Sequence, residues 1–180
     1  ATALLPMFAK DILHVGPWGL GLLRGAPAVG ALFMSAVLTR WPLRRRVGRT
    51  LLLSVGLFGV CMVVFGLSTS FLLSLVALAI SGGADMVSVV VRQTLVQLRT
   101  PDEMRGRVSA VNSVFIDTSN EMGSFESGTT AGLFGPVVSV VGGGIITVLV
   151  VGAVALAWPE LRQMRGLAEV VPTSSAAEEG

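Results

Sequence analysis

Five ionisable side chains lie within long apolar stretches of the sequence, where a helix crossing a bilayer would have to bury them. They are Arg24, Asp85, Asp117, Glu121 and Glu126. An ionised group in hydrocarbon costs at least about 2.5 kcal/mol, so such groups face a protein interior or a water-filled cavity. A carboxyl group held away from bulk water can take up and release a proton near neutral pH. These residues are therefore candidates for lining a substrate or proton path.

The depths of these residues suggest which of them meet. A helix rises about 1.5 Å per residue, which places Arg24 and Glu121 each about 9 Å below the outer surface of the membrane core. We therefore expect Arg24 and Glu121 to form an ion pair. Asp117 lies one turn from Glu121 on the same face, Glu126 points to another face, and Asp85 lies toward the cytoplasm. The alternative is that the charges only hold helices together.

The elements that carry these residues are predicted from apolar runs, since a spanning helix needs about 20 residues. Five such runs occupy residues 18–38, 50–67, 71–91, 107–134 and 137–158. The fourth is the most polar. The charges fall in the first, third and fourth runs, so we expect these helices to line a polar path and the second and fifth to face lipid. The predicted fold is an all-α polytopic membrane bundle.

Shorter features complete the predicted organisation. Residues 1–9 are apolar but too short to span a bilayer, so we interpret them as the tail of a spanning helix whose beginning is missing, and the chain as a fragment. Residues 10–17 predict a polar loop. Thr100-Pro101-Asp102-Glu103 has the pattern of a capping box, which predicts a helix starting at Pro101. Gly82-Gly83 is the expected flexing point of the third span, unless the glycines serve only close packing.

The basic residues predict the orientation. Of the 13 Lys and Arg residues, 11 fall in residues 40–49, 92–107 and 162–165, which are alternate connections and the end of the last span. Short loops rich in Lys and Arg stay in the cytoplasm. We therefore expect these connections and the C-terminus to be cytoplasmic. Residues 166–180 are rich in Ala, Ser, Thr and Glu and are expected to form a disordered cytoplasmic tail.

The composition excludes several classes of protein. The chain is 52% hydrophobic and only 13% charged, whereas a soluble domain carries about 25% charged residues. The arginines form no continuous patch with interleaved aromatic residues, which argues against nucleic-acid binding. A single cysteine, Cys61, and a single histidine leave no set for a disulfide within the chain, a metal cluster or a catalytic triad. We therefore expect no enzyme activity, metal or cofactor.

The first basic loop resembles a motif of a transporter family. Residues 40–49, with Arg40, Gly48 and Arg49, resemble the degenerate second copy of the inter-helix motif of the major facilitator superfamily, whose first glycine matches Gly30. The acidic residue of that motif is absent here.

The second basic loop and the polar run that follows extend the resemblance. Residues 101–107, with Pro101, Arg105, Gly106 and Arg107, resemble the stretch that joins helices 10 and 11 of that superfamily. Residues 112–128 are similar to helix 11 of its enterobactin-exporter-like branch. That branch more often has Gly at the position of Asp117 and Glu at that of Ser124.

The resemblance implies both a fold and a function. Residues 1–165 correspond to the C-terminal six-helix half of the superfamily fold, with its first helix truncated. The protein would be part of a multi-pass transporter of the bacterial inner membrane. It would export siderophores, drugs or other small amphipathic molecules in exchange for protons, by alternating access with the missing N-terminal half.

Two other classes of function stay open at this point. The chain would instead be a non-transporting membrane scaffold or assembly subunit if its charges are purely structural. It would be an inactive truncated fragment if it has no complementary half. The partners expected under the transporter interpretation are the lipid bilayer, a small-molecule substrate, protons and the N-terminal half, with no nucleic acid.

Overall fold

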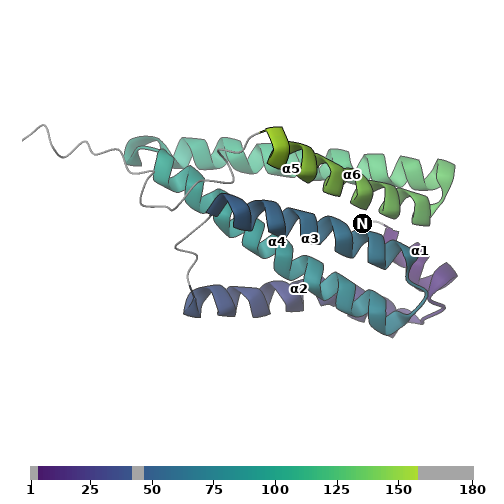
Figure 1. Cartoon of the computed structure of the whole chain (residues 1–180). Helices are drawn as coiled ribbons and strands as arrows, with labels where there is room; N and C mark the ends of the chain where they lie inside the picture. Colours follow the sequence, from purple (N-terminus) through teal and green to yellow (C-terminus); the bar gives the residue numbers. More distant parts are fainter. Residues whose placement is uncertain (1–3, 42–46, 158–180) are drawn as a thin grey trace, which may run out of the picture.

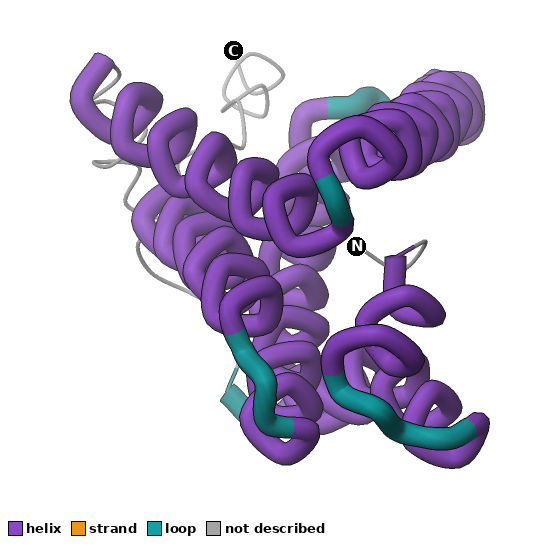
Figure 2. Tube along the Cα trace, turned by 90° about the vertical axis from the view of Figure 1, so that its right-hand side faces the viewer, coloured by secondary structure: helices purple, strands orange, loops and turns teal. Residues whose placement is uncertain are grey.

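The described part of the chain is built from helices joined by short connections (Figures 1 and 2). The computed structural model describes residues 4–41 and 47–157. The elements are α1 (Leu5–Met7), the π-helix η2 (Phe8–Ile12), α2 (Pro17–Arg40), α3 (Val47–Leu67), α4 (Phe71–Arg99), the 3-10 helix η3 (Asp102–Met104), α5 (Arg105–Phe134) and α6 (Pro136–Ala157). The predicted all-α class is confirmed.

Proline and glycine set three of the helix boundaries as their chemistry requires. Pro17 and Pro136 occupy the first positions of α2 and α6, where a missing N–H costs nothing. Gly135 has a φ of 89°, a left-handed conformation that disfavours side chains, and its N–H donates to the Ala131 carbonyl at 2.9 Å. The turn between α5 and α6 is therefore tight.

Four helices are long and apolar enough to cross a membrane: α2, α3, α4 and α6. They confirm four of the five predicted spans. The fourth predicted span is α5, a helix of 30 residues and thus about 45 Å long, but it lacks the apolarity of the others. Its length therefore suits a span, and its composition alone does not predict one.

The connection predicted at residues 92–107 is mostly helical. α4 continues through Arg92 to Arg99, about two turns beyond the predicted end of the span. The Thr100 hydroxyl donates back to the Val96 carbonyl at 2.6 Å, and the chain then makes a 3-10 turn before α5 begins at Arg105. No side chain caps α5 at its N-cap, Met104. The prediction made from the capping box, a helix that starts at Pro101, is therefore wrong, because α5 begins at Arg105.

The N-terminal segment is helical for longer than predicted. The π-helix carries the chain to Ile12, with the Leu13 N–H donating to the Phe8 carbonyl at 2.9 Å. The predicted polar loop at residues 10–17 is thus reduced to a few residues. The middle of the first basic loop and the predicted disordered tail lie outside the described residues.

The helices pack in the order α2, α4, α3, α6 and α5, so α2 and α5 are at opposite ends of the series. The main core gathers buried side chains from every α-helix at the end of the bundle where α3 ends and α4 begins, including Leu5, Leu23, Phe65, Leu78, Ala131 and Val140. A smaller cluster around Val87 and Val91 joins only α2, α3 and α4. α5 is therefore anchored at its C-terminal end and packs mainly against α6.

Two glycines allow α2 and α4 to approach closely. A Cβ added to Gly30 would collide with the backbone of Ala79, and one added to Gly82 would collide with the backbone of Pro27. α4 passes through Gly82 without a break. The structure thus favours the packing role of Gly82 over the predicted flexing point. Gly30, which matches the first glycine of the inter-helix motif, lies in this contact within α2.

Candidate functional site

The five predicted ionisable residues are all exposed and do not converge. Arg24 lies on α2, Asp85 on α4, and Asp117, Glu121 and Glu126 on α5. Arg24 and Glu121, both within the described residues, form no ion pair, because α2 packs against α4 whereas α5 packs against α6. The predicted Arg24–Glu121 ion pair is therefore not present.

Asp117 and Glu121 keep the relationship that the sequence predicts. They lie one turn apart on the unbroken helix α5, and thus on one face of it. Glu126 lies on the opposite side of that helix. From Arg105 to Glu126 every residue of α5 except Val108 and Asn112 is exposed. The charged face of the helix is uncovered by the rest of the described chain.

The basic residues of the two motifs gather at one end of the bundle. Arg40 ends α2, Arg49 lies in the first turn of α3, and Arg105 and Arg107 lie in the first turn of α5. The end of α2, the start of α3, the end of α4 and the start of α5 all lie toward the left in Figure 1. Gly48 is buried in α3, while Pro101 and Gly106 are exposed beside the turn between α4 and α5.

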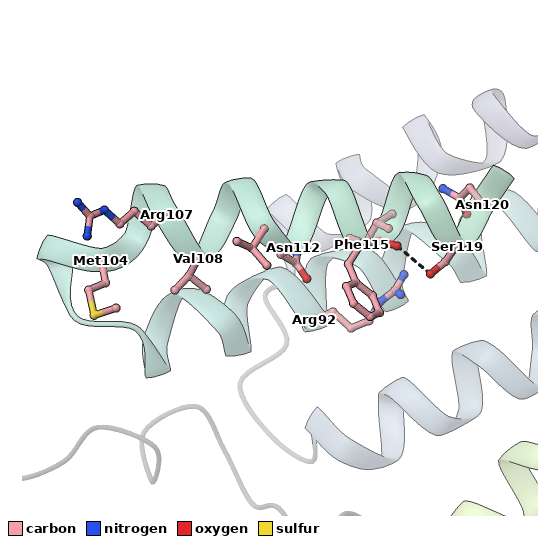
Figure 3. Close-up of a pocket in the computed structure, with 10 residues that line it drawn as sticks. Arg92, Met104, Arg107, Val108, Asn112, Phe115, Ser119 and Asn120 are labelled. Carbon is pink, nitrogen blue, oxygen red and sulfur yellow. Dashed lines mark hydrogen bonds between the residues drawn. The ribbon is translucent and has the colours of Figure 1, made fainter. Parts of the chain in front are cut away.

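Neutral polar side chains help to line three pockets of the described chain, although only charged residues were predicted as candidates for a polar path. The first has a volume of about 680 Å³ and lies between α4 and α5 (Figure 3). Its lining combines two cations with apolar and amide side chains: Arg92, Met104, Arg107, Val108, Val111, Asn112, Phe115, Ile116, Ser119 and Asn120. We call it the α4–α5 groove.

The second pocket is rich in hydroxyl groups and lies where α5 and α6 meet α3. It measures about 610 Å³, and its polar lining is Ser119, Asn120, Ser124, Ser127, Ser139 and Thr147. The Ser139 hydroxyl donates to the Ser127 carbonyl at 3.0 Å, which links α6 to α5. The third pocket, also about 610 Å³, lies between the end of α4 and the start of α5 and includes Gln93, Gln97 and Arg105.

None of the five charged residues predicted to line a path lies in the lining of these three pockets. Arg105, Gly106 and Arg107, singled out only as parts of a loop motif, do line them. The signal available in the sequence was the concentration of Ser, Asn and Gly between residues 109 and 130. In a helix of spanning length, that composition indicates a polar surface that needs no formal charge.

The fold and these surfaces define a class: a multi-pass α-helical membrane protein with polar surfaces along its helices. The chain belongs to the transmembrane secretion effector family of major facilitator transporters, whose family model matches residues 1–177. The predicted resemblance to the enterobactin-exporter-like branch is confirmed. The family is one of transporters and not of enzymes.

Curated relatives agree with this assignment. The enterobactin exporter EntS of Citrobacter koseri is 30% identical over 154 residues, which are 84% of this chain and 36% of that protein. EntS of Escherichia coli O1:K1 is 28% identical over 81% of this chain and 35% of its own length. EntS of Shigella flexneri is 27% identical over 92% and 41%. The chain thus spans well under half the length of these relatives. No solved structure matches it.

Proposed function

We propose that these helices form the C-terminal part of a proton-coupled exporter of small amphipathic molecules. The observation that carries the proposal is the exposure of α5. It is long enough to cross a bilayer, and its Asp117–Glu121 face is uncovered. Ionised groups are not tolerated against lipid tails, so other protein must cover this face when α5 spans the membrane.

The covering protein is, in our proposal, the N-terminal half of the same transporter. The relatives are more than twice as long as this chain, which leaves room for such a half. A polar helix at the contact between two halves would border a water-filled path. Rocking of one half against the other would expose that path to each side in turn, as in other transporters built from repeats.

Glu121 is proposed to carry the exchanged proton, with Asp117 one turn away on the same face. A carboxyl group at a protein–water boundary within the membrane can alternate between the two charge states as the path opens to each side. Asp85 on α4 and Arg24 on α2 are proposed to border the same path. Glu126 lies on the opposite face of α5, and of the five charged residues it is the one least connected with this proposed path.

The orientation and substrate are part of the proposal. The arginines at the ends of α2 and α4 and at the start of α5 support a cytoplasmic location for that end of the bundle. The C-terminus would then be cytoplasmic, and the membrane the bacterial inner membrane. The names of the relatives make enterobactin the first substrate to test.

The test uses inside-out membrane vesicles that contain the complete polypeptide, energised so that their interior is acidic. Enterobactin uptake and proton efflux are followed together. Glu121→Gln should lower both to the level of vesicles without the protein, while the amount of inserted protein is unchanged. Glu103→Gln is the matched control, since Glu103 lies exposed in the turn before α5.

Three results would contradict parts of this proposal. Proton-coupled uptake that persists in Glu121→Gln would remove the role of Glu121. Uptake without proton movement would remove proton coupling. Equal uptake by vesicles with and without the wild-type protein, across enterobactin and unrelated amphipathic dyes, would favour the membrane scaffold over the exporter.

A further inference from the structure

The α4–α5 groove has the chemistry of a binding site for a specific class of molecule. We propose that it binds an amphipathic anion, with the anionic group on Arg92 and an aromatic or apolar body against Phe115 and Val111. This inference rests on the proposed export function, for which it names the charge of the substrate and the place where it first binds.

The two cations of the groove lie at different depths. Arg107 is in the first turn of α5, beside the turn that joins the two helices, whereas Arg92 comes from α4 seven residues before its end. At about 1.5 Å per residue, Arg92 lies about 10 Å farther along the groove than the end of α4. A molecule arriving from the basic end would therefore meet Arg107 first and Arg92 deeper.

Arg92 is oriented by its own helix. Its Nε donates to the Ser88 carbonyl at 3.4 Å, and Figure 3 shows the guanidinium reaching from α4 toward Phe115. The terminal guanidinium nitrogens make no hydrogen bond to the part of the chain that is described. A planar fork of this kind matches a carboxylate or another oxyanion and binds it with two parallel hydrogen bonds.

The wall of the groove is apolar next to Arg92. Val108, Val111, Phe115 and Ile116 project from α5, and Phe115 is 74% exposed. An exposed aromatic ring beside a cation is suited to a flat apolar body that carries a negative charge. The volume of about 680 Å³ is that of a small-molecule site, since such pockets span about 300–1,000 Å³.

The far end of the groove is polar and uncharged. Ser119 and Asn120 supply a hydroxyl and an amide group there, Asn112 adds an amide between Val108 and Phe115, and no carboxylate is among the lining residues. The Ser119 hydroxyl donates to the Phe115 carbonyl at 2.7 Å, which leaves its oxygen as an acceptor (Figure 3). Two cations with no carboxylate beside them in the lining of the groove select against cationic molecules, because a like charge would be brought next to them.

The test measures binding of tritiated 1-naphthoate to the complete polypeptide in phosphatidylcholine nanodiscs, with 1-naphthamide as a neutral competitor of the same shape. Removing one charged hydrogen-bonding partner, as in Arg92→Gln, should weaken naphthoate binding about tenfold and leave naphthamide unchanged. Arg92→Lys, which keeps the charge but loses the planar fork, should give a naphthoate affinity between those of the wild type and Arg92→Gln. Phe115→Ala should weaken the binding of both compounds. Arg40→Gln, which removes a cation from the same end but outside the three pockets, should change neither.

The outcomes separate this inference from the exporter proposal. Equal binding of naphthoate and naphthamide, no binding of naphthoate, or an unaltered naphthoate affinity in a correctly inserted Arg92→Gln would overturn the anion site, even if enterobactin uptake proceeds. Preferential naphthoate binding that Arg92→Gln weakens, and that Arg92→Lys weakens less, would support it, even if proton-driven uptake fails.

Discussion

The rings of Phe8 and Phe65 lie with their centroids 4.7 Å apart and their planes inclined by 32°, and both side chains are fully buried. Phe8 comes from the short N-terminal helix and Phe65 from the last turn of α3. This contact joins the N-terminal segment to the main core, where every α-helix contributes a buried side chain.

Replacing Phe8 by Ala should destabilise the bundle by about 3 kcal/mol, since a large buried ring leaves a cavity. The lone cysteine, Cys61, is buried in α3 and becomes available to a thiol-reactive dye on unfolding, so it reports the melting temperature. Met7→Ala is the matched control. Because Met7 is 41% exposed, this variant should melt at the same temperature as the wild type. Equal melting of Phe8→Ala and the wild type would show that the aromatic contact does not hold this segment.

Alanine at Gly82 and at Gly21 should have opposite effects on stability. Gly82 meets the backbone of Pro27, so Gly82→Ala should force α2 and α4 apart at a cost of about 1–3 kcal/mol. Gly21 has open space around it, and Gly21→Ala should stabilise its helix by about 0.5–1 kcal/mol. The same thiol-reactive melting assay decides the sign. A stabilising Gly82→Ala would contradict the close approach of the two helices.

Arg24 and Glu121 should behave as energetically independent residues in the stability of the chain. Because they are not paired, the changes caused by Arg24→Glu and Glu121→Arg should add to within about 0.5 kcal/mol in the double variant. A double-mutant cycle on thermal stability measures this. A coupling energy above about 1 kcal/mol would indicate that the two charges meet after all.

Apolar runs and helix-ending residues allowed much of the fold to be predicted. Hydropathy alone marks α2, α3, α4 and α6, and Pro17, Pro136 and Gly135 fix helix ends through their backbone chemistry. The turn at residues 100–104 was harder to predict, because α4 continues through a polar stretch that has no helix breaker before Pro101.

The candidate site was less predictable than the fold. Depth along a helix does not fix which helices are neighbours, so the equal depths of Arg24 and Glu121 gave no information on the packing order that separates them. Charges within apolar runs do not predict the α4–α5 groove, because its lining is mostly neutral and apolar, as Asn112 and Phe115 illustrate. The sequence predicts Arg92 in a connection, whereas it lies in α4.

The proposed function requires that α5, despite its polarity, crosses the membrane. The most direct measurement places single cysteines at Glu103 and Leu133, on either side of its length, in a Cys61→Ala background, and labels intact cells with a membrane-impermeant maleimide. A spanning α5 should be labelled from outside at position 133 only, and at position 103 only after the membrane is permeabilised. Labelling of both positions in intact cells, or of neither until permeabilisation, would place both ends of α5 on one side and show that it does not span.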